Sequence, residues 1–338
     1  MKKSCPQILI ILFLILSSSS MKAQKYIWPD VKPPIAEIKS HIRDIHGDKV
    51  EDNYYWMIDF FKKGPDSTKV VSYLEAENDY LDKMMAGTKQ MQENLFTEMK
   101  NRIKEKDESV PVYKNGYYYY SRSEEGKQYY KYCRKKGNLK GKEEVLLDVD
   151  KMAEGHSYFA LSGIQVSPDN SMIAYGVDTV SRRQYTIHIK NLITGKVLKD
   201  HIPSTNGNLV WANDNKTIFY TANNPETLLS EKIKRHILNT DEKNDVIVYE
   251  EKDNTNYIGV DRSKNDQYIF IVSAGTMSSE YQFIDASKPQ SAFVPFKKRM
   301  KDVLYDVIPL ENKFLIRTNW NAKNFRLMEC PFDKTESE

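Results

Sequence analysis

The chain has 338 residues, of which 40% are hydrophobic and 29% are charged, a balance typical of a folded protein with a substantial core. Its 50 basic and 47 acidic residues give a formal net charge of +3, which is too small for charge-driven binding of nucleic acid. The longest apolar run, residues 8–16, has about half the length that a bilayer crossing requires. We therefore expect neither a nucleic-acid partner nor a membrane span.

The first 23 residues have the order of a secretory signal peptide. Lys2 and Lys3 precede the apolar run, and serines and a short segment ending in Ala23 follow it. Cleavage after Ala23 would remove three lysines and no acid, which leaves 47 basic against 47 acidic residues in the mature chain. This interpretation predicts export across the inner membrane and a periplasmic location.

Residues 24–105 are predicted to form a helical extension. From Ser67 to about Ile103 apolar residues recur every three to four positions, and Gly87 interrupts the pattern, which predicts two amphipathic helices. The apolar stripe of the second helix consists of Met91, Leu95, Met99 and Ile103. Such a stripe is typical of a packing face, so it requires a partner surface.

Residues 106–338 change to a period of two and repeat one plan, in which a short turn separates two apolar strands. Each turn carries an Asn, Asp or Glu, and these markers recur at about fifty residues, the period of a propeller blade. The markers are Asn115, Asp169, Asp214, Asp266 and Glu311. Further strands follow in each repeat, and four antiparallel strands per period form the blade of a β-propeller. A β-sandwich would not repeat a four-strand template.

The fifth repeat has three predicted strands before the last residue, Glu338. The sequence therefore predicts a mainly β fold with a partial propeller of about 4.75 blades, preceded by the α-helical segment. The last blade would present a bare edge unless another segment pairs with it, because unpaired backbone groups recruit other chains.

No motif for catalysis or cofactor binding is recognisable. A nucleophile elbow, Gly-x-Ser-x-Gly, does not occur, and the nearest segments are residues 155–157 and 273–275. Ser157 follows His156 directly, and adjacent side chains of an extended chain point to opposite faces, so this His cannot activate this Ser. Walker and Gly-x-Gly-x-x-Gly loops are also absent. We assign no catalytic residue and expect no cofactor.

Metal and disulfide chemistry are not indicated either. His41 and His46 lack the spacing and the Glu of a helical zinc site, and no Cys-x-x-Cys pair occurs. Cys133 and Cys330 are expected to be free thiols. The paired carboxylates Glu250 and Glu251 are expected at a strand end, in contact with solvent.

One loop offers the candidate substrate-binding residues, Arg182 and Arg183. They follow Asp178 and lie between the second and third predicted strands of the second repeat. Loops in this position line one mouth of a propeller, so the two arginines would contact another domain or meet a peptide carboxylate. The alternative is an exposed loop that binds nothing.

Several segments of the chain resemble the prolyl oligopeptidase family, in the form found in oligopeptidase B. The first are residues 33–36, His46-Gly47-Asp48, and the double tyrosine Tyr54-Tyr55 followed by Trp56. The resemblance continues in the family's order at residues 73–78, 113–117, 167–170, 181–185, 210–214 and 249–253. It covers nearly the whole mature chain.

The resemblance implies a secreted serine endopeptidase in which a seven-bladed propeller caps an α/β-hydrolase domain and admits short peptides, with cleavage after Lys or Arg. In that family the N-terminal helices belong to the hydrolase domain, and the catalytic Ser, Asp and His come from the C-terminal half. This sequence has no counterpart of those three positions. We expect the N-terminal portion of such an enzyme, inactive alone, as a truncated or split product or as one half of a complex with a separate hydrolase chain.

Two alternatives stay open. A stand-alone periplasmic binding module would keep the propeller for recognition, and it predicts a stable fold with a ligand in the central channel. An enzyme whose propeller carries a site of another chemistry has no motif in its favour.

Overall fold

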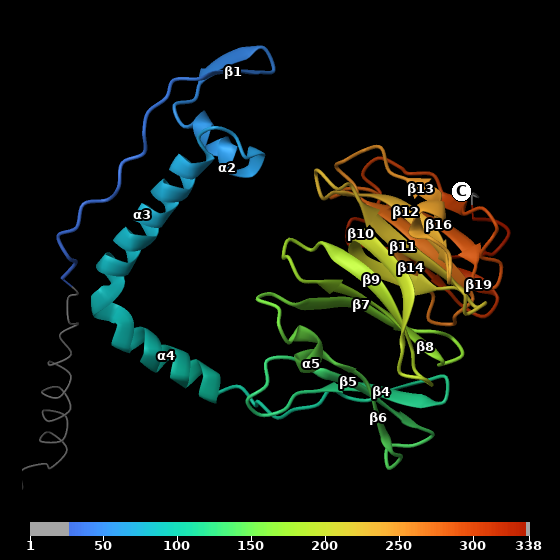
Figure 1. Ribbon diagram of the computed structural model, residues 1–338. Coiled ribbons are helices and arrows are strands. Elements are labelled where there is room, and N and C mark those ends of the chain that lie inside the picture. The colour runs from blue at the N-terminus through green and yellow to red at the C-terminus, as the bar shows by residue number, and fades with distance from the viewer. Residues whose placement is uncertain (1–26, 336–338) are drawn as a thin grey trace, which may run out of the picture. The chain divides into compact units, whose positions relative to one another are not determined.

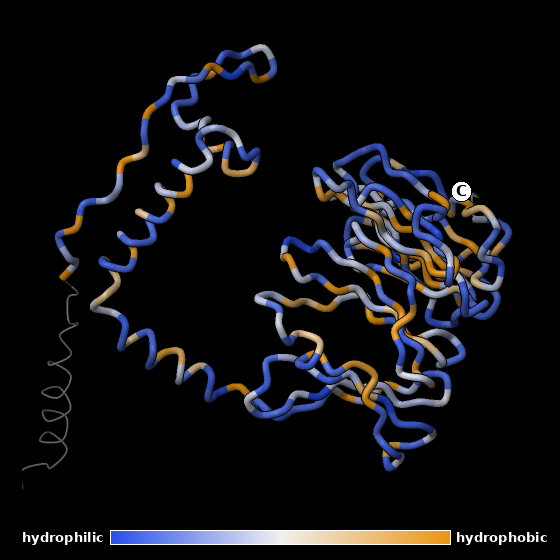
Figure 2. Tube along the Cα trace, in the orientation of Figure 1, coloured by the Kyte–Doolittle hydropathy of each residue, from blue (hydrophilic) through white to orange (hydrophobic). Residues whose placement is uncertain are grey.

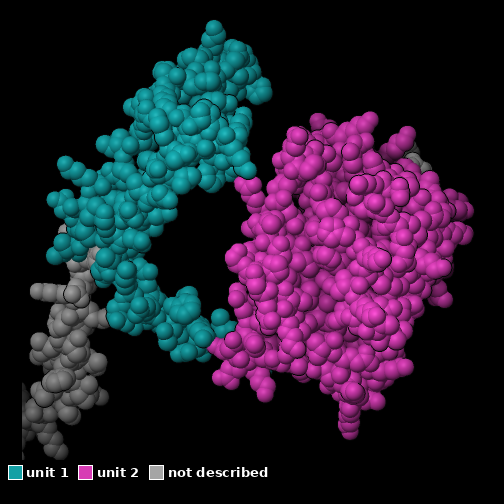
Figure 3. Space-filling model, in the orientation of Figure 1, with its two compact units in different colours: residues 1–104 teal, residues 105–338 magenta. Residues whose placement is uncertain are grey.

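The computed structural model describes residues 27–335, so the predicted signal peptide lies outside the described residues. The chain divides after Lys104 into two compact units (Figure 3). Within residues 27–335, no helix combines the length and the apolar character that a membrane crossing would need.

The first unit consists of a small hairpin followed by helices (Figure 1). Strands β1 (Ile42–Ile45) and β2 (Asp48–Glu51) pair antiparallel. Two short helices, η2 (Tyr55–Ile58) and α2 (Asp59–Lys62), lead into the long helix α3 (Ser67–Met85). The turn η3 (Ala86–Thr88) then separates α3 from α4 (Lys89–Asn101). The prediction of two helices interrupted at Gly87 is confirmed.

Few side chains of the first unit are buried. Trp56 is 8% exposed and its indole Nε1 donates to the backbone oxygen of Glu37 at 2.9 Å, while Val70 of α3 is 4% exposed. Helix α4 has no buried residue, and its apolar stripe is between 49% and 69% exposed at Leu95, Met91, Met99 and the following Ile103. The stripe that the sequence predicted as a packing face is therefore open in this chain.

The second unit is built from antiparallel sheets (Figure 1). The first sheet has four strands, β3 (Val112–Lys114), β4 (Tyr117–Arg122), β5 (Lys131–Lys136) and β6 (Glu143–Asp148), and the helix α5 (Val149–Ala153) follows it. The second sheet has seven strands, β7 (Ala160–Val166), β8 (Met172–Asp178), β9 (Tyr185–Asn191), β10 (Val197–Trp211), β11 (Thr217–Asn223), β12 (Ser230–Ile237) and β13 (Val246–Glu250).

The last two sheets are smaller. The third has four strands, β14 (Tyr257–Arg262), β15 (Tyr268–Ala274), β16 (Ser279–Asp285) and β17 (Val294–Lys297). The fourth has three, β18 (Tyr305–Pro309), β19 (Lys313–Thr318) and β20 (Arg326–Pro331). The mainly β fold and the recurring four-strand template are confirmed, and the number of blades stays a prediction.

Strand β10 differs from the prediction. The sequence predicts two strands, one ending the second repeat and one opening the third, whereas the structure has a single strand that pairs with β9 along its first half and with β11 along its second. Pro203 and Ser204, whose φ is 55°, lie where the register with β9 shifts. A bulge at this point bends the strand without ending it, and this joins two four-strand arrangements into one seven-stranded sheet.

The core of the second unit lies between neighbouring sheets, because inner strands bury both of their faces. Hydrophobic residues, coloured orange, are frequent along these strands (Figure 2). Strand β11 shows the alternation most clearly. Its residues Ile218 and Tyr220 pack in a cluster with Ile187 of β9, and the intervening Phe219 packs on the other side with Ile269 of β15. All of these side chains are 1% exposed or less, so β11 is buried on both faces, and its residues 218–220 form a continuous apolar run in the sequence.

The marker turns of the five repeats are joined to one another by hydrogen bonds. Asn170 donates from Nδ2 to the backbone oxygen of Asn115 at 2.9 Å, and Asn215 accepts at Oδ1 from the backbone nitrogen of Asp169 at 2.9 Å. The series is continued by Asn213, which donates to Asp266 O at 3.1 Å, and by Asn265, which donates to Pro309 O at 3.5 Å. The turns thus hold one end of the four sheets together.

A buried ionisable cluster joins β10, β11 and β12 of the seven-stranded sheet to the connection before β13. His236 of β12 is 0% exposed, and its ring nitrogens contact Asp245 at 2.8 Å and Asp200 at 3.0 Å. Tyr220 donates to the other oxygen of Asp245 at 2.9 Å, and the backbone nitrogen of Asn239 donates to Asp200. Burial by itself lowers the pKa of His236, but the hydrogen bonds and charges of the two aspartates outweigh it and raise that pKa above 6.5.

We predict that Gly163→Ala unfolds or severely destabilises the second unit. Gly163 of β7 has a φ of 60°, and a Cβ atom there would lie 1.6 Å from the backbone oxygen of Gly207. The expected loss exceeds about 4 kcal/mol in a urea unfolding experiment. The matched control is Gly195→Ala, because Gly195 has a φ of 72° but nothing within 4 Å of the added atom. This control should lose only about 1–2 kcal/mol, and equal losses would contradict the close approach.

We also predict that His236→Gln destabilises the protein more at pH 6 than at pH 9. Because the pKa of His236 is raised on folding, its contribution is complete below pH 6.5 and is lost as the pH rises through the folded-state value. At pH 6 the substitution should cost about 3–5 kcal/mol, since it leaves two buried carboxylates without a cation. Urea unfolding across this pH range measures the difference.

His188→Gln is the control for the pH experiment. Burial and then the neighbouring His201 lower the pKa of His188, so its contribution is present above its unfolded-state pKa and is lost as the pH falls. The two variants should therefore show opposite slopes against pH. Parallel slopes would mean that the charge on His236 does not stabilise the fold.

Candidate functional site

A hollow of about 740 Å³ in the second unit is lined by loops at the strand ends opposite the marker turns. We call it the loop cavity. Its lining comes from Arg182 and Arg183 in the β8–β9 loop and from Asn206 in β10. Asn223 and residues 227–231 contribute from around the β11–β12 loop, and residues 251–254 and 256–258 from around the β13–β14 loop. The structure thus brings both candidate arginines into one cavity.

The arginine loop has an uncommon backbone. Ser181, Arg182 and Arg183 have φ angles of 74°, 68° and 59°, so three successive non-glycine residues adopt the left-handed conformation. Asp178, which is 0% exposed, holds the loop at both ends, because its carboxylate accepts from the backbone nitrogen of Val180 at 2.9 Å and from that of Gln184 at 3.2 Å. A buried carboxylate bonded to backbone amides therefore sustains this conformation.

The β13–β14 connection forms one side of the loop cavity, which we call its wall. The wall is organised around Glu251. Its carboxylate accepts hydrogen bonds from Ser273, from Tyr249 at 2.9 Å and from the backbone nitrogen of Asp253 at 3.0 Å, and it forms an ion pair with Arg299 at 3.1 Å. Burial would raise the pKa of Glu251, but these hydrogen bonds and the charge of Arg299 lower it below its ordinary value. Glu251 is consequently ionised and fully engaged within the wall.

The expectation that Glu250 and Glu251 both meet solvent is wrong for Glu251. Its side chain is only 12% exposed, whereas Glu250 is exposed and pairs with Lys232 at 3.5 Å. Sequence reasoning missed the network because Arg299 lies 48 positions away in the chain. The one available signal was the alternation of β13, which places Tyr249 and Glu251 on the same face.

The remaining acids of the cavity also have partners. Asn224 donates from Nδ2 to both carboxylate oxygens of Glu231, at 3.3 and 3.2 Å. Asp253 accepts from the hydroxyl of Thr255 at 2.7 Å and from its backbone nitrogen at 3.0 Å, and these bonds lower the pKa of Asp253. By contrast, among residues 27–335 Arg183 has no hydrogen-bond or ion-pair partner.

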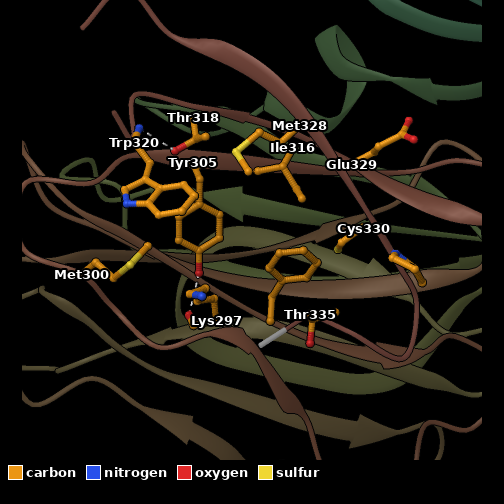
Figure 4. Close-up of a pocket in the computed structure, with 12 residues that line it drawn as sticks. Lys297, Met300, Tyr305, Ile316, Thr318, Trp320, Met328, Glu329, Cys330 and Thr335 are labelled. Atoms are coloured by element: carbon orange, nitrogen blue, oxygen red, sulfur yellow. Dashed lines mark hydrogen bonds between the residues drawn. The ribbon is translucent and has the colours of Figure 1, made fainter. Parts of the chain in front are cut away.

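A second hollow, of about 180 Å³, lies between the third and fourth sheets (Figure 4). Tyr305 points into it and donates from its hydroxyl to the backbone oxygen of Lys297 at 2.7 Å, beside Trp320 and Met328. Cys330 also lines it, and burial raises the pKa of this thiol, which opposes formation of a reactive thiolate. Its lining is mostly apolar and lies between two sheets, and it also includes Lys297 and Glu329.

The other residues considered from the sequence do not assemble a reactive site. Cys133 and Cys330 are free thiols as predicted, and burial raises the pKa of Cys133 to about 11. Ser273 is 2% exposed and donates to Glu251, so its hydroxyl belongs to the wall network. The ring of His156 packs near Phe159. Within the described part of the chain, no three His, Cys, Asp or Glu side chains gather into a group that could hold a metal ion.

The sequence model of the family described as "Prolyl oligopeptidase, N-terminal beta-propeller domain" matches residues 33–338. The chain belongs to this family. It is 38% identical over 321 residues to "Dipeptidyl aminopeptidase BI" of Pseudoxanthomonas mexicana, an alignment that covers 90% of this chain and 44% of the relative. It is 34% identical over 315 residues to "Protease 2" of Moraxella lacunata, with 91% and 45% coverage.

Solved structures of family members support the same fold. Oligopeptidase B from Leishmania major aligns with a TM-score of 0.82 at 27% identity, over 90% of this chain and 45% of that chain. Oligopeptidase B from Trypanosoma brucei aligns with a TM-score of 0.81 at 25% identity and the same coverage. The family's β-propeller domain is therefore confirmed, and the chain spans about half the length of the relatives it matches.

We predict that Asp178→Asn loosens the arginine loop. An amide group can accept only one of the two backbone hydrogen bonds, so a buried donor loses its partner at a cost of about 1–3 kcal/mol. Hydrogen exchange at the amides of Val180 and Gln184 should accelerate, and the free energy of unfolding should fall. Asp241→Asn is the control, because Asp241 caps η4 (Glu242–Asn244) at the surface and Asn caps helices about equally well. Unchanged exchange in Asp178→Asn would show that the loop holds its shape without the carboxylate.

Proposed function

We propose that this chain is the peptide-admitting propeller portion of a secreted, oligopeptidase B-like serine endopeptidase that cleaves short peptides after Lys or Arg. Membership of the prolyl oligopeptidase family is the observation that carries this proposal. The chemistry of cleavage would be supplied by a hydrolase domain, in the same polypeptide or in a separate chain. The predicted signal peptide would place the protein in the periplasm.

Two features of the first and second units support a role beside a hydrolase. The apolar stripe of α4 is exposed, as expected for a surface that packs on another domain. The loop cavity collects arginines and amide side chains at one end of the sheets, where a peptide can be bound by polar contacts. Neither feature provides a nucleophile paired with a base, so these residues would bind and position a substrate without breaking its amide bond.

The relative named as a dipeptidyl aminopeptidase suggests a second candidate activity, the release of dipeptides from a free N-terminus. This alternative shares the fold and the hydrolase chemistry, and it differs in the substrate. A blocked N-terminus therefore distinguishes the two activities, because endopeptidase cleavage tolerates the block and dipeptide release requires the free amine.

The test is to recover the native protein from its source cells with an antibody against residues 105–335. We expect a polypeptide that contains or accompanies these residues to react with a fluorophosphonate, a reagent for activated serines. The recovered material should hydrolyse blocked coumarylamide peptides ending in Arg or Lys at least about 100-fold faster than those ending in Ala. This ratio is expected if the basic side chain of the substrate forms a buried ion pair with the proposed hydrolase domain.

The recombinant chain of 338 residues is the control for this test, and it should neither react with the fluorophosphonate nor hydrolyse the peptides. Material from the cells that shows no labelling would favour the stand-alone binding module. Hydrolysis restricted to peptides with a free amine would favour dipeptide release. Hydrolysis by the recombinant chain itself would contradict the assignment of chemistry to another domain.

A further inference from the structure

The loop cavity has the dimensions of a ligand site. Its volume of about 740 Å³ lies within the range of roughly 300–1,000 Å³ that small-molecule sites occupy. The lining is unusually polar, and amides from three separate segments, Asn206, Asn223 and Asn254, face the same space. A ligand that fills this cavity must therefore carry several hydrogen-bonding groups.

The charged side chains of the lining indicate the sign of the charge that a ligand would carry. Three acids line the cavity, and each already accepts hydrogen bonds from the protein: Glu231 from Asn224, Glu251 from Ser273 and its neighbours, and Asp253 from Thr255. The guanidinium of Arg183 has no hydrogen-bond or ion-pair partner among the described residues, and the side chain is exposed to the cavity mouth. The charge left without a partner in the lining is therefore positive, so the complementary group is an anion.

The backbone provides an independent indication at the same position. Arg183 ends the run of three left-handed residues, a conformation that proteins maintain mainly where a side chain has to be presented in a fixed direction. Asp178 is buried beneath the loop and bonds its two ends, so the loop is organised before any ligand arrives. The backbone that carries Arg183 is thus held in place, and a guanidinium can bind a planar carboxylate through two parallel hydrogen bonds.

We propose that the loop cavity binds short peptides by their free carboxyl terminus, with the guanidinium of Arg183 as the ligand of the carboxylate. The amides of the lining would bind the peptide backbone, and the ring of Tyr257, which is 81% exposed at the rim, would cover its side chains. This inference rests on the proposed function in one respect, since a peptidase propeller is the reason to expect a peptide as the anion.

The experiment measures binding to the purified chain by titration calorimetry, with acetyl-trialanine as the free acid and as the amide. The acid should bind at least about tenfold more tightly than the amide, the effect of one charge-assisted pair. Arg183→Gln should reduce binding of the acid to the level of the amide and leave the amide unchanged. Arg183→Lys should restore part of the difference, because it keeps the charge and loses the planar fork.

Arg326→Gln is the matched control, because Arg326 is an exposed arginine of β20 that lies outside the cavity lining. It should bind the acid as the unaltered chain does, and thermal melts of all variants verify that they are folded. Equal binding of acid and amide, or no binding of either by the folded chain, would overturn the inference. A preference for the acid that persists in Arg183→Gln would overturn it too.

Inorganic phosphate and acetate test the identity of the anion. If either one displaces the peptide acid at a concentration equal to that of the peptide, the cavity is a general anion site and the peptide assignment is wrong. Because turnover is not measured, a negative result here leaves the fluorophosphonate labelling of the native protein unaffected. The inference and the proposed function can therefore fail separately.

Discussion

The second unit depends on the burial of sheet faces against neighbouring sheets. No sheet of three or four short strands is stable with both faces in water, so each one gains its core from the sheets beside it. The two clusters that meet across β11 show this directly, since Phe219 and Tyr220 are adjacent in the chain and belong to different cores. The stability of any one sheet is therefore a property of its contacts with the others.

The marker turns and the loop cavity are two consequences of the same hairpin arrangement. Antiparallel strands reverse direction at each turn, so alternate connections gather at opposite ends of the sheets. At one end the Asn side chains of the marker turns bond to the neighbouring turns. At the other end, polar groups of the β8–β9, β11–β12 and β13–β14 connections line the loop cavity. One end thus provides rigidity and the other provides a place for a ligand.

Much of this architecture could be predicted from local patterns. The period of two gave the strands, the recurrence of Asn115, Asp169, Asp214, Asp266 and Glu311 gave the template, and Gly87 gave the break between helices. The continuity of β10 could not be predicted, because Pro203 signals a strand end and only pairing with β9 and β11 shows that the strand bends. The arginine pair was recognisable as a loop feature from its position between two strands.

The wall of the cavity was beyond sequence reasoning for a physical reason. Glu251, Ser273 and Arg299 come from three segments, and nothing local distinguishes this glutamate from the solvated Glu250 beside it. Only the packing of the third sheet brings the three together. Glu231 and Asp253 are bonded by residues close in sequence, whereas the partners of Glu251 follow from tertiary contacts and not from composition.

The long strand β10 also bears on how this architecture can change in evolution. Repeat proteins gain and lose units by duplication or deletion of a segment whose ends fall in connecting loops. Here the connection between two template units is itself a hydrogen-bonded strand, with Pro203 at its bend. An exchange of genetic material at that border would sever backbone pairing on both sides, so the two units are expected to be inherited as an inseparable pair.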